Sequence, residues 1–435
     1  MTPKTFKIKS FGCQMNVYDG ERMAELLGQK GMTAAADDGE ADLVVLNTCH
    51  IREKAAEKAY SDIGRLTRED GSKPLIALAG CVAQAEGTEA RRRSSLIDIV
   101  VGPQAYHRLP QMIDEVERGA RPVDTDMPAI SKFEVLPERK RASPSAFLTI
   151  QEGCDKFCTY CVVPYTRGAE ISRPRDDIIA EAHALVDAGA REIVLLGQNV
   201  NAWTHETFAF ADLIRSLAKI DGLDRIRYTT SHPADMTDDL IAAHGEVGKL
   251  MPYLHLPVQS GSNRVLKAMN RSHTAETYLR ILEKMRAARP DIALSGDFIV
   301  GFPGETDEEF EATLKLVDEV GYASAYSFKY SARPGTPAAV MEDQISRDVM
   351  DERLQRLQQR INAHRLAFNQ SKVGIDTQIL VERPGKYAGQ VIGRSPWLQS
   401  VHVEVHAHPG DIIDVTLVGA GPNSMAGAIE EKVAA

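Results

Sequence analysis

The sequence lacks the features of a membrane or secreted protein. None of the apolar runs in its 435 residues approaches the roughly 18 residues that suggest a membrane-spanning helix. The first ten residues, MTPKTFKIKS, contain no apolar signal-peptide core. These absences predict a cytoplasmic protein with no membrane partner, in a compartment where thiols stay reduced.

An excess of positive charge is also missing. The chain has 51 Lys and Arg residues against 61 Asp and Glu residues, a formal net charge of −10. A nucleic-acid-binding protein is usually basic, so the overall charge does not indicate one. Local arginine patches remain at Arg91–Arg93, at Arg139–Arg141, and at Arg167 with Arg173 and Arg175. The first two are the leading candidates for binding RNA.

Cysteine is scarce, and its six copies fall into two sets. Cys154, Cys158 and Cys161 lie within eight residues, in QEGCDKFCTYCVVPYTRG. Cys13, Cys49 and Cys81 are scattered singly through the first hundred residues. In a reducing compartment, cysteines suggest metal binding or catalysis before disulfides.

The first hundred residues repeat one plan three times. Apolar runs at 5–11, 41–48 and 74–80 each end at or just before a cysteine, and helix-compatible sequence follows. This pattern predicts βαβ units with a parallel sheet. Ligands collect beyond the carboxyl ends of such strands, so the three cysteines can converge on one point.

The rest of the chain predicts two more domains. The stretch 119–145 is rich in proline and charge and indicates a linker. About six strand–helix repeats follow, which predict an incomplete parallel barrel because a closed eightfold one needs about 250 residues. An amphipathic helix over 346–370 places Leu354, Leu357 and Ile361 on one stripe. Short strands from 372 onward predict a small β-barrel or sandwich.

The fold class is therefore α/β with three domains. We place an N-terminal parallel-sheet domain at 1–120, a partial (β/α)6 barrel at 140–371 and a small C-terminal β-barrel at 372–435. The last segment has five basic and seven acidic side chains, which weakens any claim that it alone holds RNA. Its His402, Glu404, His406 and His408 alternate at period two and predict a polar, solvated strand face rather than a metal site.

Three thiolates in one loop are one short of a closed site. Zinc would want a fourth ligand, and a 4Fe–4S cluster is also usually held by four cysteines. With three, one iron is open, and S-adenosylmethionine (SAM) can bind there through its amino and carboxylate groups. A zinc knuckle or three buried thiols are the alternatives.

The loop resembles the signature of the radical SAM enzymes. Together with GCQMN, NTCHIRE and GCVAQAEG in the first hundred residues, it makes nearly the whole chain similar to the methylthiotransferases of that superfamily. The resemblance implies that the C-terminal barrel is a TRAM domain, an RNA-binding module. It also implies that the enzyme adds a methylthio group to C2 of N6-dimethylallyladenosine next to the anticodon in tRNA.

The resemblance also assigns residues and partners. It implies that Cys154, Cys158 and Cys161 are catalytic and bind a radical-generating 4Fe–4S cluster, and that Cys13, Cys49 and Cys81 bind a second one. Two SAM molecules would be used per product, with a flavodoxin or ferredoxin as electron donor and a monomeric enzyme. The residues expected to bind the cofactor are Tyr160, Glu170, Arg173, Gly197, Gln198, Asn199, Gly301, Gly304 and Glu305.

Two other interpretations of the sequence stay open. One is a sister methylthiotransferase that acts on threonylcarbamoyl-adenosine in tRNA or on an aspartate of a ribosomal protein. The other is a non-enzymatic, metal-stabilised RNA-binding protein, which leaves the cysteines of the first domain without a role.

Overall fold

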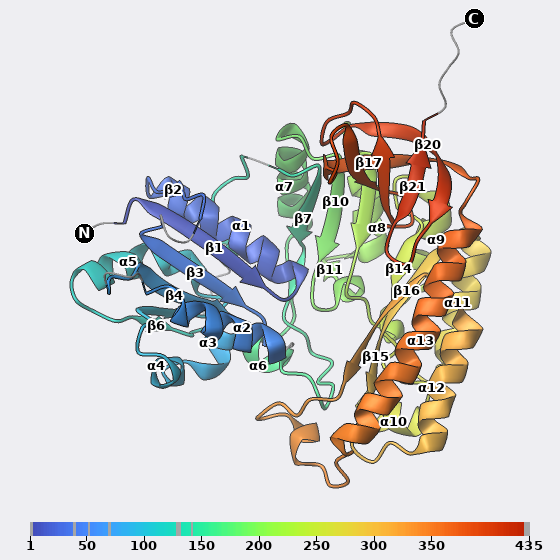
Figure 1. The fold of residues 1–435 in the computed structure, drawn as a ribbon, viewed down its shortest axis with the longest axis horizontal. Helices are drawn as coiled ribbons and strands as arrows, with labels where there is room; N and C mark the ends of the chain where they lie inside the picture. Colours follow the sequence, from blue (N-terminus) through green and yellow to red (C-terminus); the bar gives the residue numbers. More distant parts are fainter. Residues whose placement is uncertain are drawn as a thin grey trace, which may run out of the picture. The chain divides into compact units, whose positions relative to one another are not determined.

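The computed structural model describes residues 3–37, 41–50, 53–67, 71–127, 132–140 and 142–429. The chain forms two compact units, drawn in Figure 1. The first unit comprises Met1–Arg139, Glu152–Asp155 and Cys161–Ile171, and the second comprises Lys140–Gln151, Lys156–Tyr160 and Ser172–Ala435. Among the described residues, no helix combines the length and the apolar character needed to cross a bilayer.

The first unit is built on the predicted parallel sheet. Its six strands pair in the order β2-β1-β3-β4-β5-β6, and every pair is parallel. The strands are β1 (Thr5–Phe11), β2 (Thr33–Ala34), β3 (Leu43–Thr48), β4 (Leu75–Gly80), β5 (Ile99–Val101) and β6 (Val123–Asp124). The helices are α1 (Gln14–Gln29), α2 (Glu53–Gly64), α3 (Cys81–Glu86), α4 (Glu89–Arg93), α5 (Leu109–Glu117) and α6 (Val163–Arg167), with 3-10 turns at Tyr106–Arg108 and Lys132–Glu134.

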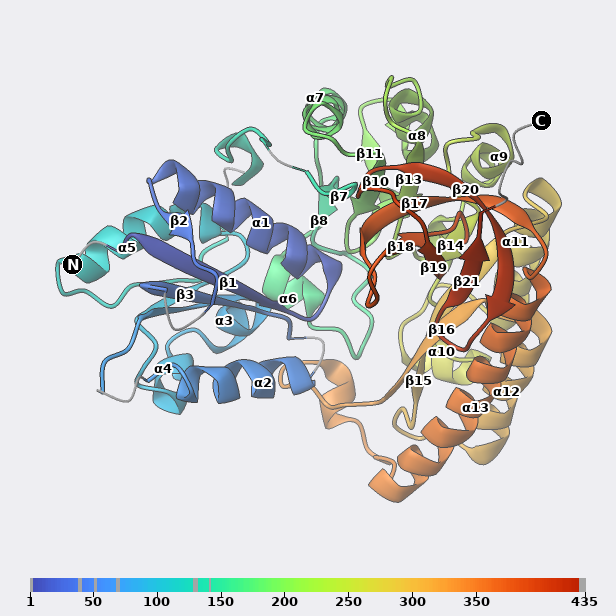
Figure 2. The same cartoon turned by 45° about the horizontal axis from the view of Figure 1, so that its top comes forward.

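Helices cover both faces of this sheet, as Figure 2 shows. Val45 and Ala77 pack with α1 and α5, whereas their neighbours Val44 and Ile76 pack with α2 and α4. Successive residues of a strand point to opposite faces, so a sheet covered on both faces needs apolar residues throughout. That requirement explains the unbroken apolar runs in β3 and β4.

The prediction of a linker at 119–145 is wrong for part of that stretch. Residues of β6 pair with β5 in the sheet. The side chain of Lys132 is fully buried between Asp19 and Glu152, and that of Arg139 is buried against Glu21 and Glu25. Charged composition usually indicates solvent exposure, but here carboxylates of the same unit neutralise the two cations inside the fold.

The second unit contains the predicted strand–helix repeat. Six parallel strands form two sheets, β13-β10-β7 and β14-β15-β16. Backbone hydrogen bonds of Ile226 with Lys249 and Met251 continue the array from the first sheet towards the second. The strands are β7 (Ser145–Thr149), β10 (Glu192–Leu196), β13 (Arg225–Tyr228), β14 (Tyr253–His255), β15 (Ala293–Val300) and β16 (Ser324–Lys329).

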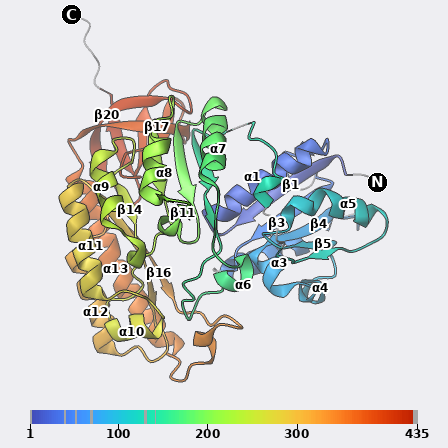
Figure 3. The ribbon, with the colours of Figure 1, turned by 180° about the vertical axis from the view of Figure 1, so that it is seen from behind.

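Helices between and after these strands cover the outside of the array. In Figures 1 and 3, α11, α12 and α13 stand side by side. Leu357 and Ile361 of α13 are buried in the core, as the predicted stripe requires. The helices are α7 (Arg175–Asp187), α8 (Phe210–Leu217), α9 (Asp238–Glu246), α10 (Asn263–Ala268), α11 (Ala275–Ala288), α12 (Asp307–Val320) and α13 (Arg347–Ser371). Short elements are β11 (Thr204–His205), β12 (Phe208–Ala209), three 3-10 turns (Val200–Ala202, Pro233–Asp235, Pro337–Val340), and β8 (Gln151–Glu152) and β9 (Ile171–Ser172) where the units meet in sequence.

The C-terminal segment forms a closed five-stranded barrel, β17-β18-β19-β21-β20. Its strands are β17 (Asp376–Pro384), β18 (Gln390–Arg394), β19 (Ser400–Glu404), β20 (Ile412–Ala420) and β21 (Met425–Ala428). Arg225 and Arg227 of β13 donate to four of its carbonyl groups, at 2.7 to 2.8 Å, and the indole N–H of Trp397 donates to the Asp291 carbonyl. These contacts fix the barrel on the strand–helix array.

Candidate cluster and cofactor sites

The three scattered cysteines lie at the carboxyl ends of adjacent strands. Phe11 at the end of β1 pairs with Thr48 of β3, which in turn pairs with Gly80 of β4. Cys13 follows two residues after β1, and Cys49 and Cys81 directly follow β3 and β4. The sheet register therefore brings together three residues that lie 36 and 32 positions apart in the sequence.

Close packing holds Cys13 and Cys49 together. Gly12 has φ +117°, and a Cβ on it would lie 2.2 Å from the Cβ of Cys49, so only glycine fits this turn. A hydrogen bond with the Cys49 thiol lowers the pKa of Cys13 to about 6 despite burial, and the charge of Arg167 adds to the effect. Burial raises the pKa of Cys81, and Arg167 opposes this rise.

Two buried asparagines fix the turns that carry these cysteines. The side-chain amide of Asn47, the penultimate residue of β3, donates to the Asn16 carbonyl at 2.7 Å. Asn16 lies in the first turn of α1, and its Oδ1 is 3.1 Å from the Cys13 sulfur. The Asn16 amide reaches back to Asn47 Oδ1 at 3.3 Å. The pair ties the start of α1 to the end of β3.

A buried ionic network lies beside the cysteines. Arg167 donates to Asp19 at 2.6 Å and to Glu152 at 3.0 Å, and Lys132 contacts the same two carboxylates at 3.3 and 2.7 Å. Burial by itself would lower the pKa of Arg167, but Asp19 and the neighbouring cysteine and Glu152 charges raise it well above its usual value. The guanidinium is therefore a permanent charge next to Cys13 and Cys81.

The donor set suits an iron–sulfur cluster. Among the described residues, no group of three His, Cys, Asp or Glu side chains has the arrangement of a metal site. None of the six cysteines is in a disulfide, however, and three of them share one sheet edge beside a buried cation. Soft thiolate ligands next to a positive charge fit an anionic iron–sulfur cluster better than a hard cation such as Mg²⁺.

The three-cysteine loop is divided between the units. In the first unit, the backbone N–H of Cys154 donates to the Gly168 carbonyl at 3.3 Å. In the second unit, the Arg271 guanidinium lies 3.6 Å from the sulfur of the buried Cys158. Phe157, just before Cys158, has φ +47°. The Asn270 amide holds this turn by donating to the Phe157 carbonyl at 3.0 Å.

Tyr160 is anchored by an apolar cluster of the second unit. Its ring packs with Val265, Met269, Phe302, Tyr330 and Ala338. The preceding residue, Thr159, donates from its backbone to the Met269 carbonyl and accepts from the Ala338 backbone. The aromatic residue therefore positions the loop between the last two cysteines, and a direct cofactor contact from it stays a prediction.

The segment Gly197–Asn199 follows β10 and presents a buried acceptor. The backbone N–H groups of Gln198 and Asn199 donate to Gln151 Oε1 at 2.9 and 3.1 Å. The Asn199 amide donates to Asp235 at 2.9 Å, which leaves Asn199 Oδ1 buried without a hydrogen-bond partner in the described chain. An orphaned carbonyl oxygen in a buried site suits a ligand ammonium group. The residues fit the methionyl end of SAM.

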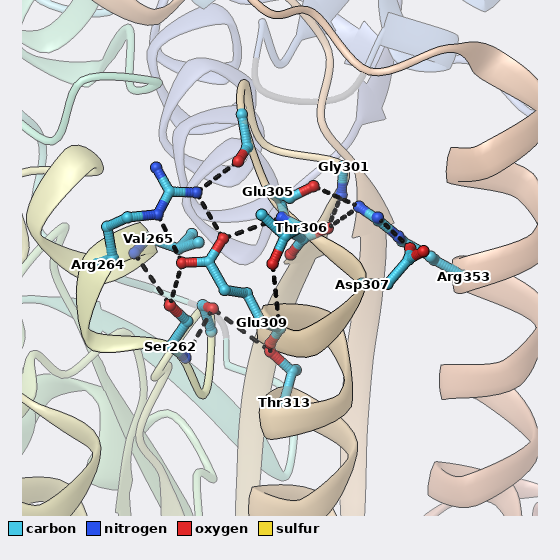
Figure 4. A network of polar contacts seen from close by, with 12 residues as sticks. Ser262, Arg264, Val265, Gly301, Glu305, Thr306, Asp307, Glu309, Thr313 and Arg353 are labelled. Atoms are coloured by element: carbon cyan, nitrogen blue, oxygen red, sulfur yellow. Dashed lines mark hydrogen bonds and ion pairs between the residues drawn. The ribbon is translucent and has the colours of Figure 1, made fainter.

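The motif after β15 forms the tight turn in Figure 4. Gly301 has φ +71°, and its N–H donates to Glu305 Oε2 at 2.7 Å. Arg353 of α13 pairs with the same oxygen at 2.8 Å and with Asp307 at 2.7 Å. Burial raises the pKa of Glu305. The Glu305 carboxylate thus stabilises the turn, and contacts from it, Gly301 or Gly304 (φ +74°) to a cofactor stay a prediction.

Below that turn, α12 begins with a capping box. Thr306 accepts from the Glu309 N–H, while Glu309 accepts from the Thr306 N–H at 2.9 Å. Arg264 Nε also donates to Glu309 at 2.6 Å, and this bond lowers the pKa of Glu309 to about 2. Figure 4 shows the pair beside Ser262.

Arg173 and Glu170 differ in their burial and in the contacts that they make. The Arg173 side chain is buried, donates to the Thr149 carbonyl at 2.6 Å and pairs with Glu181 at 2.8 Å. Glu170 is half-buried, and its backbone N–H donates to Asp155 Oδ1 at 3.2 Å. Arg173 therefore braces the start of α7, and a cofactor role for either residue stays a prediction.

The predicted arginine patches are divided between the interior and the surface of the fold. Arg91 donates to the Asp98 and Pro122 carbonyls, and Arg93 stacks on the Tyr60 ring. Arg139 is buried, which corrects its assignment to an RNA-binding surface, and Arg141 lies outside the described residues. Arg92 is 79% exposed and pairs with Glu89, and Arg93 is 49% exposed and pairs with Glu86, so a phosphate contact from either residue stays a prediction.

Sequence reasoning missed the polar residues that hold these sites. Asp19, Asn47, Lys132, Gln151 and Asp235 lie far in sequence from the residues they contact. The sequence predicted Arg167 as a member of an arginine patch and not as a neighbour of the cysteines. Its position in the quoted loop motif was the available signal; its burial next to Cys81 was not readable from the sequence.

Comparisons with known proteins agree over the whole chain. Residues 148–317 match the family described as "Radical SAM superfamily", and residues 5–102 match "Uncharacterized protein family UPF0004". Curated proteins named tRNA-2-methylthio-N(6)-dimethylallyladenosine synthase are similar along nearly their full length. The one from Novosphingobium aromaticivorans is 67% identical over 98% of both chains, and one from Cereibacter sphaeroides is 61% identical over 97% of both.

Solved structures with low sequence identity share the fold. The radical SAM methyltransferase TsrM from Kitasatospora setae has a TM-score of 0.55 at 14% identity, over 78% of this chain and 77% of that one. The cobalamin-dependent radical enzyme OxsB has a TM-score of 0.54 at 13% identity, over 83% of this chain and 56% of that one. These likenesses concern the fold alone.

Proposed function

The chain belongs to the family of tRNA-2-methylthio-N(6)-dimethylallyladenosine synthases, and from this premise we propose how its own residues divide the work. It is a radical SAM methylthiotransferase that adds a methylthio group to C2 of N6-dimethylallyladenosine next to the anticodon in tRNA. It uses SAM and a 4Fe–4S cluster. The relatives' shared name favours this substrate over those of the sister enzymes.

Cys154, Cys158 and Cys161 would hold the radical-generating cluster. When bound, this cluster would supply the electron that cleaves SAM, and the protein supplies orientation and exclusion of water. The orphaned Asn199 Oδ1 would accept a hydrogen bond from the methionyl ammonium, while Asp235 holds the Asn199 amide in that orientation. Gln151 fixes the backbone of the same segment through its two accepted hydrogen bonds.

The Asn199 assignment has a direct binding test. A hydrogen bond to a charged group contributes about 1.5–3 kcal/mol, so Asn199→Ala should weaken SAM binding about ten- to hundredfold. Isothermal titration of the anaerobically reconstituted protein measures this. Asn263→Ala removes an exposed amide that pairs with Glu276 and is the matched control. Equal affinity of both variants would contradict the assignment.

Cys13, Cys49 and Cys81 would hold a second 4Fe–4S cluster, which would supply the sulfur for the transfer. The observation that supports this assignment is the register of β1, β3 and β4, because it places the three cysteines at one sheet edge. SAM would supply both the methyl group and the radical, so each product would use two SAM molecules.

The partners follow from this chemistry. The substrate is tRNA, and its adenosine must be splayed out of the anticodon loop to reach the site. Each turnover needs an electron from a donor of the flavodoxin or ferredoxin class. We propose a monomer acting in the cytoplasm, where tRNA is found and thiols stay reduced.

Iron counting tests the two assignments together. Anaerobic reconstitution should give about eight irons per chain, and alanine at either set of three cysteines should leave about four. The Cys13/Cys49/Cys81→Ala variant should still cleave SAM to 5′-deoxyadenosine under a strong reductant but yield no methylthio product. Stoichiometric zinc without iron, or loss of SAM cleavage in that variant with four irons retained, would refute the division.

A further inference from the structure

Arg167 is a buried cation of the first unit, and the reaction described so far assigns it no role. It is the last residue of α6, which begins two residues after Cys161. Its side chain is 3% exposed. The guanidinium donates to Asp19 and Glu152, and α6 packs against α3, whose first residue is Cys81.

The charges around Arg167 balance without any help from the cysteines. Lys132 and Arg167 are the cations, Asp19 and Glu152 are the anions, and all four side chains are at most 3% exposed. A buried guanidinium needs such partners, because desolvation costs several kcal/mol per ion. Salt-bridge pairing accounts for the burial of Lys132, which contacts both carboxylates. It does not account for the position of Arg167 on α6, which packs against α3 where that helix begins at Cys81.

We propose that Arg167 is a positioning residue for the cluster held by Cys13, Cys49 and Cys81. In this role Arg167 donates to the Cys81 sulfur and raises the reduction potential of the cluster. This inference rests on the proposed function, since it takes those cysteines as the ligands. Net charge and hydrogen bonds to sulfur are the levers by which a protein sets such potentials. A fixed positive charge favours the state with one more electron.

The inference is tested by the sign of the shift in reduction potential, because the network contains both a cation and carboxylates that can be neutralised separately. Arg167→Gln removes a positive charge and should lower the reduction potential. Asp19→Asn removes a negative charge from the other side of the same guanidinium and should raise it. Arg167→Lys keeps the charge and should hold the potential near that of the parent. A general loosening of the site would not produce opposite shifts.

The experiment uses a full-length parent in which Cys154, Cys158 and Cys161 are alanine, so that its remaining irons belong to the other cluster. Iron content is measured first, and the midpoint potential follows from anaerobic redox titration monitored by electron paramagnetic resonance. Arg167→Gln should shift the reduction equilibrium at least tenfold, which is about 59 mV for one electron. Arg93→Gln is the control, because Arg93 pairs with Glu86 and is 49% exposed.

The outcomes separate the two proposals. Absence of iron in the parent refutes the assignment of Cys13, Cys49 and Cys81, before any further substitution. About four irons with unchanged potentials in Arg167→Gln and Asp19→Asn overturns the role of Arg167. Shifts of equal sign in these two variants overturn it as well. If Arg167→Gln does not retain iron, Arg167→Lys and Asp19→Asn decide: the parent potential in the first and a raised one in the second support the inference, and any other pair contradicts it.

Discussion

Gly12→Ala is the substitution for which the geometry gives the most definite expectation. Gly12 has φ +117°, and its added Cβ would lie 2.2 Å from Cys49 Cβ and 3.2 Å from Cys49 Sγ. Carbon atoms in contact are about 3.5–4.0 Å apart, so one of the two must move by about 1.5 Å. The backbone conformation itself costs an L-residue on the order of 1–3 kcal/mol. The displacement falls on Cys49, which we propose as a cluster ligand.

Gly31→Ala separates strain from displacement. Gly31 also has a positive φ, +88°, but a Cβ there meets no atom within 4 Å. Gly31→Ala should lose about 1–3 kcal/mol of unfolding free energy from backbone strain alone, measured by urea denaturation of the reconstituted protein, and Gly12→Ala should lose more because the clash adds to the strain. Only Gly12→Ala should fall from about eight to about four irons per chain. Eight irons in both variants would refute the reasoning that Gly12 sets the place of Cys49.

Two further perturbations test the second unit. Arg353→Met leaves the carboxylate of Glu305 buried without its cation and should lower the unfolding free energy by about 3–5 kcal/mol. Arg356→Met on the same helix removes an exposed ion pair and should lower it by at most about 1 kcal/mol. Equal urea midpoints for the two would contradict this. Burial lowers the pKa of His244 to about 3, whereas an unfolded histidine titrates near 6.5. The unfolded state alone therefore binds the proton in mild acid, and stability is full above about pH 6.5 and lost as pH falls towards 3. The difference in unfolding free energy between pH 7 and pH 5 should be about 2 kcal/mol smaller in His244→Gln. The same difference should be unchanged in His408→Gln, which replaces an exposed histidine.

The parts of the fold that follow from local pattern were predictable. The apolar runs of β3 and β4 predicted both the strands and the cysteines at their ends, because a strand buried on both faces needs apolar residues throughout. β1 is only partly buried and was predicted from its strand-like length before Cys13. The closed C-terminal barrel and the parallel array agree with the predicted alternation of strands, helices and turns.

The interior charges were not predictable, because their partners are distant in sequence. Arg167 pairs with Asp19 across 148 positions, and Lys132 pairs with the same residue across 113. Composition around Lys132 and Arg139 therefore suggested a linker and a surface patch. Only the folded chain brings the neutralising carboxylates to these cations, and no local pattern reports such a pairing.

Nucleoside analysis of turnover on matched anticodon stem-loops tests the central claim most directly. The reconstituted enzyme, SAM and a reductant are incubated anaerobically with one RNA that carries N6-dimethylallyladenosine and one that carries unmodified adenosine. The product is then identified by mass spectrometry. Burial of an apolar prenyl group is worth a few kcal/mol, at about 0.8 kcal/mol per methylene. The account predicts methylthio product at C2 of the prenylated RNA and little on the other. Equal turnover on both RNAs, or modification of a ribosomal protein peptide instead, would contradict it.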